Sequence, residues 1–202
     1  MKSFDQNKEE LSPAVKNIHD DLISQCRNND RKAQLQVYNL YYKAMYNTAL
    51  RIVNDTAEAE DIMQESFLDA FRSIADYRGD SSFGSWLKKI VVNRSLDVLK
   101  RSKALVSIEE TGTDVAESGE DEDYMEILSA RAEQIRKAIH RLPDAYRISL
   151  SLFLLEGYDH EEIASILGIS NNLSRIRFFR AKQRLIEYLK EEHQSRSQSR
   201  TN

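Results

Sequence analysis

The sequence of 202 residues is poor in the features that several protein classes require. Its single cysteine, Cys26, excludes an internal disulfide, and without a nearby histidine and acid pattern it fits a buried small side chain better than a nucleophile. No apolar run approaches the roughly 20 residues of a membrane span, and residues 1–16 have no apolar core of a secretory signal. We therefore expect a protein of the reducing cytoplasm, neither exported nor embedded in a membrane.

The sequence also lacks the motifs of the common enzymes. It contains no GxxxxGK[ST] or GxGxxG loop, and its histidines are scattered. The segment His160-Glu161-Glu162 begins like a zinc-protease helix, but Ala164 stands where HExxH needs its second histidine. No cysteine cluster offers metal ligands. We expect a protein that is not an enzyme and that holds no metal or cofactor.

With two prolines and six glycines, the chain has few helix breakers, and its long segments follow a helical period. We therefore predict an all-α fold. The segment "SIEETGTDVAESGEDED" is acidic and poor in large apolar residues, which is typical of a flexible linker between two small helical domains. The predicted parts are an N-terminal extension 1–29, in which 17–26 form a short extra helix, a first domain 30–104, a linker 105–124, a second domain 125–191 and a disordered tail 192–202.

The formal charge of −4 hides an uneven distribution. Residues 76–104 carry seven Lys/Arg and three Asp/Glu, and residues 173–202 carry eight and three, net charges of +4 and +5. Between them, residues 105–128 carry nine acids and no base. Two basic surfaces that contact a polyanion, separated by a linker that avoids it, explain this pattern. Two solvated helix faces and a disordered loop explain it as well.

The first domain begins with two amphipathic helices. The first has Asp30 as its expected N-cap, and helical spacing assigns its aromatic residues to core packing rather than to stacking on bases. The second begins at Asp55 and Glu58, a pair that resembles a capping box. Its outer face is acidic with one apolar residue, Leu68, and suits either solvent or a basic partner helix.

The segment "FGSWLKKIVVNRSLDVLKR", residues 83–101, places its largest hydrophobe away from its apolar side. Leu87, Val91, Val92, Leu96, Val98 and Leu99 gather on one broad side, which only Lys88 and Ser95 interrupt. Trp86 lies on the opposite side, among basic and amide side chains. The indole either contacts DNA or caps the core beneath the preceding loop, and Phe83 is expected to anchor the core or the loop.

Residues 160–185 have the pattern of a helix-turn-helix. Ala164 and Gly168 allow two helices to approach and turn, and Ser170 can cap the second helix at Asn171. The second helix is basic, as expected for a helix that lies in the major groove with phosphates at its flanks. A structural helical hairpin is the alternative, and His160 is expected to have a structural role.

In this order, the segments resemble the extracytoplasmic-function type of sigma-70 family transcription initiation factors. The similar stretches, within about 30–104 and 130–190, are "AEDIMQESF", "YRGDSSFGSWLKKIVVNRSLDVLKR" and "LPDAYRISLSLFLLEGYDHEEIASILGIS". The resemblance implies an alternative sigma factor in which the first domain binds core RNA polymerase and the −10 promoter element and the second binds the −35 element. It also implies an anti-sigma factor as a partner.

The resemblance further implies roles for individual residues. The polymerase-binding residues would be Asp61, Gln64, Glu65 and Leu68. The −10 DNA-binding residues would be Arg78, Trp86, Lys89, Asn93 and Arg94. The −35 DNA-binding residues would be Asn171, Asn172, Ser174, Arg175 and Arg180. Asp97 is expected to form an ion pair along its own helix.

The predicted recognition helix departs from the family pattern "S-x-G-T-V-x-S-R", because its aligned run is "SNNLSRIR". Leu173, Ile176 and Phe179 fall where polar residues are usual, and they face either thymine methyl groups or a protein.

The sequence also fits two other classes of protein. One is a dimeric helix-turn-helix regulator that binds an operator without engaging polymerase, and the other is a helical adaptor that binds only protein.

Overall fold

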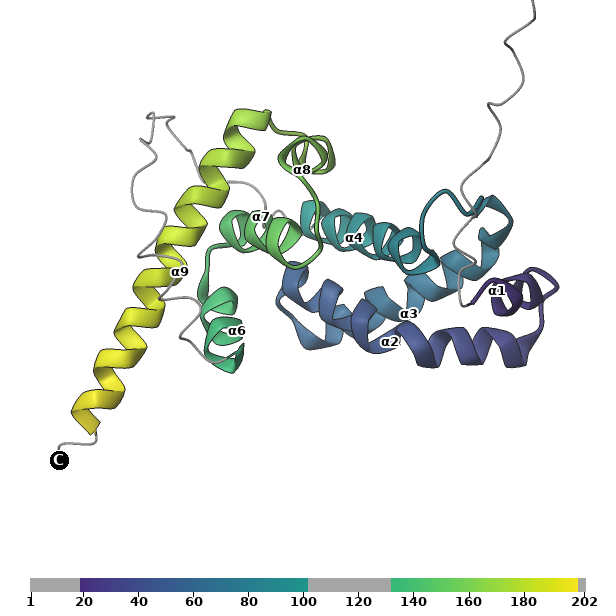
Figure 1. The fold of residues 1–202 in the computed structure, drawn as a ribbon, viewed down its shortest axis with the longest axis horizontal. Helices are drawn as coiled ribbons and strands as arrows, with labels where there is room; N and C mark the ends of the chain where they lie inside the picture. The colour runs from purple at the N-terminus through teal and green to yellow at the C-terminus, as the bar shows by residue number, and fades with distance from the viewer. Residues whose placement is uncertain (1–18, 102–131, 200–202) are drawn as a thin grey trace, which may run out of the picture.

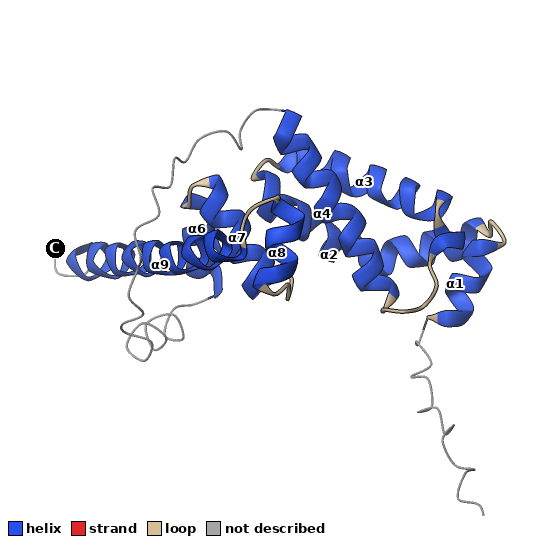
Figure 2. Ribbon diagram, turned by 90° about the horizontal axis from the view of Figure 1, so that it is seen from above, coloured by secondary structure: helices blue, strands red, loops and turns tan. Residues whose placement is uncertain are grey.

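The computed structural model describes residues 19–101 and 132–199, and within these ranges every regular element is helical (Figure 2). This confirms the predicted all-α class; the predicted linker and the residues around it lie outside the described ranges. The helices are α1 Asp20–Arg27, α2 Arg31–Val53, α3 Thr56–Arg72, the 3-10 turn η1 Ile74–Asp76, α4 Phe83–Arg101, α6 Ala132–Arg141, α7 Asp144–Leu154, α8 His160–Leu167 and α9 Asn171–Ser199.

The first four helices form one group around a hydrophobic core (Figure 1). Helix α3 packs its predicted apolar face, including Met63 and Phe67, against α2 and α4. The tyrosines of α2 border this core as expected, with the Tyr38 ring centroid 4.9 Å from that of Phe67. Two leucines of α2 do not join it, because Leu35 and Leu40 are 60% and 53% exposed.

The short helix predicted over residues 17–26 is present as α1, and it packs on α2. Its buried residues Ile23 and Cys26 belong to the core of the first group. Burial raises the pKa of the Cys26 thiol, and the nearby Asp30 carboxylate raises it further. The thiol is therefore protonated and enclosed, which confirms the predicted packing role.

Side-chain caps define where the helices of the first group begin. Asp30 accepts hydrogen bonds from the backbone N–H groups of Lys32 and Ala33, at 2.8 and 3.2 Å. Asp55 accepts one from the N–H of Glu58, at 2.9 Å. Asp30 and Asp55 are confirmed as N-caps, and they satisfy donors that the first turn of a helix leaves without an intrahelical acceptor. Of the pair Asp55 and Glu58, only this half of a capping box forms.

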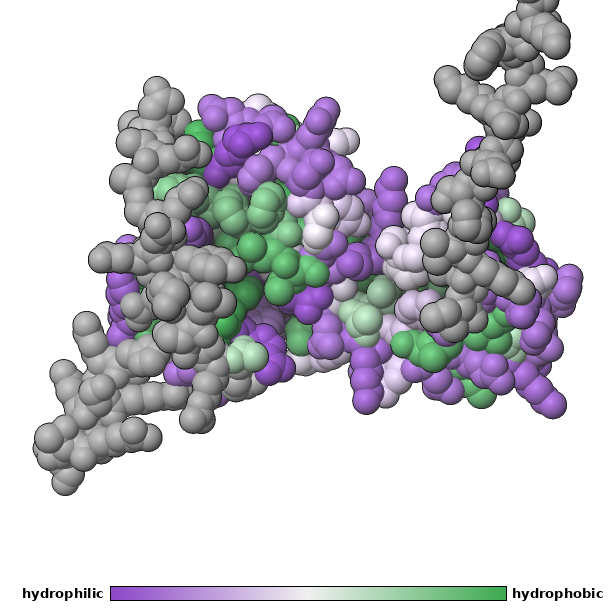
Figure 3. Space-filling model, in the orientation of Figure 1, coloured by the Kyte–Doolittle hydropathy of each residue, from purple (hydrophilic) through white to green (hydrophobic). Residues whose placement is uncertain are grey.

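The second group consists of α6 to α9, with the long helix α9 crossing the other three (Figure 1). Its own core lies between α6, α7 and α9 and includes Leu142, Leu150 and Leu185. On the face drawn in Figure 3, hydrophobic surface gathers over this group inside a mainly hydrophilic rim. Leu154 and Leu155, at the end of α7, are 50% and 47% exposed.

A separate cluster joins the two groups. It contains Ile52 of α2, and Val92, Leu96 and Leu99 of α4, from the first group. Ile148, Leu152 and Ile163 of the second group pack against them, and all seven side chains are buried. The two groups therefore share a hydrophobic interface in addition to their own cores.

Helix α8 begins with a capping box that the sequence analysis did not identify. The Asp159 carboxylate accepts hydrogen bonds from the N–H groups of Glu161 and Glu162, each at 2.8 Å. The Glu162 carboxylate in return accepts one from the N–H of Asp159, at 2.9 Å. This reciprocal pair fixes the start of a helix that has only eight residues.

Replacing this cap should destabilise the second group. We expect Asp159→Ala to lower the free energy of unfolding by about 1 kcal/mol, because the N–H groups of the first turn lose their acceptor. Asp159→Asn, which keeps a side-chain oxygen, should change it much less. Urea denaturation of the full chain, followed by circular dichroism, measures both variants. Equal losses in the two would contradict a capping role.

Candidate nucleic-acid interface

Trp86 lies at the edge of an aromatic cluster at the start of α4. Its ring centroid is 5.4 Å from that of Tyr77 and 5.5 Å from that of Phe83. Phe83 and Tyr77 are buried, whereas Trp86 is only partly buried. The expected anchoring role of Phe83 is confirmed. The indole thus packs on the core through part of its surface and leaves the rest accessible.

The loop before α4 is held by its own hydrogen bonds. The Tyr77 hydroxyl donates to the carbonyl of Ser81 at 2.7 Å, and the Arg27 guanidinium donates to the carbonyl of Tyr77. Ser82 caps α4 by accepting a hydrogen bond from the N–H of Ser85 at 3.2 Å. Gly79 has a φ of +85°, a left-handed conformation that favours glycine. Arg78, beside it, is exposed.

The predicted −10 residues divide into two sets on α4. Lys89 and Asn93 are exposed on the same side of the helix as Trp86. Arg94 instead turns toward α3, where its Nε donates to Glu65 Oε2 at 2.8 Å and its other nitrogens contact Glu65 and Asp69. Asp97 forms the expected ion pair along the helix, at 4.0 Å from Lys100.

The predicted polymerase-binding residues lie together on the outer face of α3. Asp61, Gln64, Glu65 and Leu68 are all exposed, and Leu68 is 54% exposed. The Gln64 amide donates to Glu60 at 3.3 Å, and Glu65 receives Arg94. The face therefore offers carboxylates around an apolar side chain, and one of these carboxylates is already paired.

Helices α8 and α9 have the geometry expected of a helix-turn-helix. Gly168 has a φ of +68° at the end of α8, and the N–H of Leu173 donates to Ser170 Oγ at 3.1 Å. The predicted turn and cap are thereby confirmed. Asn171, Asn172 and Arg175 are exposed at the start of α9, where Asn171 accepts a hydrogen bond from Arg175 at 3.0 Å.

Ser174 differs from these neighbours because its side chain is fully buried. Its hydroxyl lies 3.0 Å from His160 Nδ1, and the His160 ring stacks on Phe153 at a centroid distance of 4.6 Å. Burial lowers the pKa of His160, and the nearby Arg175 lowers it further, although Asp159 opposes the shift. Ser174 and His160 thus join the two helices, as a structural histidine should. In this arrangement the Ser174 hydroxyl does not reach the surface.

Leu173, Ile176 and Phe179 are partly buried, and so is Arg180 farther along α9. The three apolar side chains lie neither in a closed core nor on a fully exposed face. The side on which the sequence departs from the family pattern is therefore a half-buried apolar strip.

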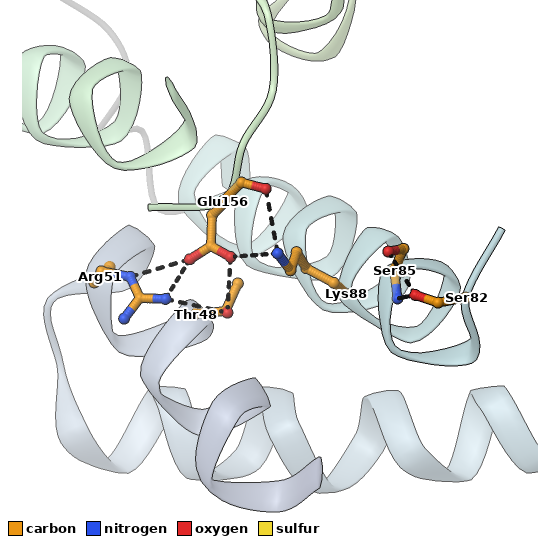
Figure 4. Close-up of polar contacts among 6 residues, drawn as sticks. All are labelled: Thr48, Arg51, Ser82, Ser85, Lys88 and Glu156. Atoms are coloured by element: carbon orange, nitrogen blue, oxygen red, sulfur yellow. Dashed lines mark hydrogen bonds and ion pairs between the residues drawn. The ribbon is translucent and has the colours of Figure 1, made fainter. Parts of the chain in front are cut away.

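A set of polar residues between the two groups was not predicted from the sequence. Glu156, in the turn after α7, is buried and contacts Thr48, Arg51 and Lys88 (Figure 4). Arg147 of α7 is also buried. The sequence contained one sign of these contacts: the polar residues Lys88 and Ser95 interrupt the apolar side of α4. Their partners are distant in the sequence and cannot be assigned from periodicity.

Metal-binding clusters and membrane-spanning helices are both absent from the part of the chain that the structure describes. Within residues 19–101 and 132–199, no three or more His, Cys, Asp or Glu side chains are placed to hold a metal ion together. None of the helices described there is long and apolar enough to span a bilayer.

Comparison with known proteins gives matches to two parts of the chain. Residues 37–104 match the family model for sigma-70 region 2, and residues 132–185 match the model for sigma-70 region 4. The ECF RNA polymerase sigma-E factor of Escherichia coli K12 is 31% identical over 173 residues, which cover 80% of this chain and 89% of that protein. The sigma-E factor of Haemophilus influenzae is 30% identical over 171 residues, with 80% and 90% covered.

Solved structures show the same fold. The sigma factor RpoE of Bartonella quintana, solved with the anti-sigma factor NepR, has a TM-score of 0.52 at 24% identity, over 77% of this chain and 95% of that one. CnrH, solved with the cytosolic domain of CnrY, has a TM-score of 0.50 at 19% identity, over 84% and 96%. From the region 2 and region 4 matches and the sigma-E relatives, the chain belongs to the extracytoplasmic-function sigma factors, the alternative sigma-70 family members that direct transcription initiation by RNA polymerase.

Proposed function

We propose that this sigma factor opens the −10 element with the face of α4 that carries Trp86, Lys89 and Asn93. The observation that carries the proposal is the placement of an accessible indole, an amide and a cation on one side of a helix that is otherwise packed into the core. Taking a base out of the stack costs a few kcal/mol, and stacking on an aromatic side chain returns about 1–3 kcal/mol per base.

Arg78 and Arg94 have different places in this proposal. Arg78 is exposed in the loop beside the aromatic cluster, where a cation suits a backbone phosphate. Arg94 pairs with Glu65 and Asp69, so it orients α4 on α3 instead of contacting a base. The same pairing links the DNA-binding helix to the helix proposed to bind polymerase.

The outer face of α3 is proposed to dock on core RNA polymerase. Asp61 and Leu68 supply a charge and an apolar anchor, which suits a basic helix of the partner. This face lies away from the interface between the two groups, which involves α2, α4, α7 and α8. Polymerase can therefore approach α3 without displacing another described part of the chain.

The −35 element is proposed to bind the start of α9. Asn171, Asn172 and Arg175 are exposed there and suit base edges and phosphates, and Arg180 fits a phosphate at the flank. Ser174 is omitted from the proposed contacts because it is buried against His160. We assign the two DNA-binding units to the predicted domains at 30–104 and 125–191.

The remaining parts of the proposal follow from the family. The factor acts by binding, without catalysis, in the bacterial cytoplasm, and it requires core RNA polymerase and promoter DNA. An anti-sigma factor is proposed as its inhibitor, since the sigma factor RpoE, which has a similar fold, was solved in complex with one.

Charge reversal on α3 should weaken polymerase binding. We expect Asp61→Lys combined with Gln64→Ala to weaken binding to core RNA polymerase by at least roughly tenfold, because a repulsive charge enters the docking face. Circular dichroism should show unchanged helix content, since both side chains are exposed. Asp21→Lys on the exposed part of α1 is the control and should bind normally. Unchanged affinity in the double variant would favour an operator-binding regulator that never engages polymerase.

Removing the α4 groups should impair promoter opening more than polymerase binding. We expect Trp86→Ala and Asn93→Ala each to reduce open complexes by roughly tenfold or more, because one stacking contact or base hydrogen bond is lost. The measurement is transcription with core polymerase on supercoiled genomic fragments, with sequencing of RNA 5′ ends. Start sites that depend on the protein but persist undiminished in both variants would contradict the proposed face.

A further inference from the structure

Two adjacent phenylalanines of α9 lie in different surroundings. Phe178 packs inward, with its ring centroid 4.5 Å from that of Phe153 and 5.5 Å from that of His160. Phe179 is also partly buried, but among the residues that the structure describes it packs against none of the three hydrophobic clusters. The same is true of Ile176. These two apolar side chains therefore contribute to no described core.

Ile176 and Phe179 lie on the side of α9 opposite its buried side. Ser174 and Ala181 are both buried, Ser174 beside His160 and Ala181 in the core of the second group. With 100° per residue, Ile176 and Phe179 lie about 160° and 140° from Ser174 around the helix axis. Asn172, which is exposed, lies about 160° from Ser174 as well. The three residues thus share the outer face of the helix.

This outer face is bordered by positive charge. Between Asn171 and Arg184, α9 carries five Lys or Arg residues and no Asp or Glu. None of the five is buried: they are Arg175, Arg177, Arg180, Lys182 and Arg184. Duplex DNA has phosphates on both sides of the groove that a helix enters, so cations on the flanks of an apolar strip suit it. Charge complementarity therefore favours DNA as the occupant of the outer face.

The outer face has the dimensions of a major-groove contact. Asn172 and Phe179 are separated by about 10 Å along the axis, at 1.5 Å per residue. The major groove is about 12 Å wide and admits an α-helix, whose N-terminal residues contact base edges. Ile176 and Phe179 differ by about 4.5 Å along the axis, and base pairs are about 3.4 Å apart. They can therefore meet bases that are one or two steps apart.

Apolar side chains in the major groove favour thymine. The C5 methyl group of thymine is an apolar group on a base edge there, where the other groups are mainly hydrogen-bond donors and acceptors. A polar base edge against Ile176 or Phe179 would lose water without gaining a hydrogen bond. The amide of Asn172 suits adenine, which pairs with thymine. All three residues of the outer face thus favour A·T pairs.

We propose that Ile176 and Phe179 determine specificity at the −35 element by contacting the methyl groups of two thymines, one or two base pairs apart. The proposal rests on the proposed function, because it requires that α9 binds this element. It gives a role to two of the positions at which the sequence departs from the family pattern. Apolar side chains that read methyl groups stand there in place of polar ones that read hydrogen-bonding groups.

The first step of the test identifies the element that α9 binds. Duplexes that bind the full-length chain together with core RNA polymerase are selected from a pool of random sequence. The element of α9 is the shared element that is no longer enriched when Asn172 and Arg175 are both replaced by alanine. It is then resynthesised with deoxyuridine in place of thymidine, because uracil pairs like thymine and lacks only the C5 methyl group.

We expect uracil to weaken binding of the parent chain by roughly tenfold, since each buried methyl group contributes about fourfold. Ile176→Ala combined with Phe179→Ala should bind the thymine duplex more weakly and should not respond to uracil. Each single variant should lose the response at one thymine only. Leu40→Ala removes an exposed apolar side chain of α2, which has no proposed DNA contact. This matched control should respond to uracil as the parent chain does.

Two results would overturn the methyl contacts and leave the proposed −35 function standing. One is an element that depends on Asn172 and Arg175 but binds the parent chain equally well with thymine and with uracil, in which case the apolar strip belongs to a protein partner. The other is a double variant that retains its helix content and still responds to uracil in full. If no element depends on Asn172 and Arg175, the −35 assignment of α9 is overturned together with the methyl contacts.

Discussion

Helix α4 has to pack on two different neighbours and still expose a third face, and much of the molecule follows from this constraint. Phe83, Leu87 and Val91 enter the core of the first group, whereas Val92, Leu96 and Leu99 enter the cluster shared with the second. Because 100° separates successive residues, the two sets form neighbouring stripes, and Lys88 and Ser95 fall between them. What remains is a polar face in which Trp86 is only partly buried against the core.

The broad apolar side of α4 was visible in the sequence, and so were the caps at Asp30, Asp55 and Ser170. These features depend on residues within a few positions of one another, so periodicity and short-range hydrogen bonding are sufficient to predict them. This broad side packs on two different neighbours, the core of the first group and the cluster shared with the second. Such packing depends on residues far apart in the sequence, so local patterns do not predict it. The sequence predicted two separate domains with a linker between them, and it contained no periodic signal that the domains pack together.

The difference between local features and tertiary contacts also explains which predicted site residues lie on the surface and which do not. Asp61, Gln64, Glu65 and Leu68 share a helix face because of their spacing, and the structure places them together on the surface. Arg94 and Ser174 were assigned to DNA from their positions in similar segments, but their neighbours are Glu65 and Asp69 in one case and His160 in the other. A carboxylate 29 residues away, or a histidine on the preceding helix, becomes a partner only through tertiary packing.

Ion pairs within the protein reduce the positive charge that residues 76–104 can offer to DNA. Lys88 faces Glu156, Arg94 faces two carboxylates of α3, and Lys100 lies 4.0 Å from Asp97, so three of the seven basic residues in this segment pair with the protein's own acids. Since each phosphate contact adds to the salt dependence of DNA binding, α4 should contribute less to that dependence than its sequence charge implies. In the proposed function, discrimination at the −10 element then depends mainly on the indole of Trp86 and the amide of Asn93, whose contacts with bases salt would screen weakly. A helix that stabilises its own fold with its cations is suited to recognising separated strands after polymerase has brought the promoter to it.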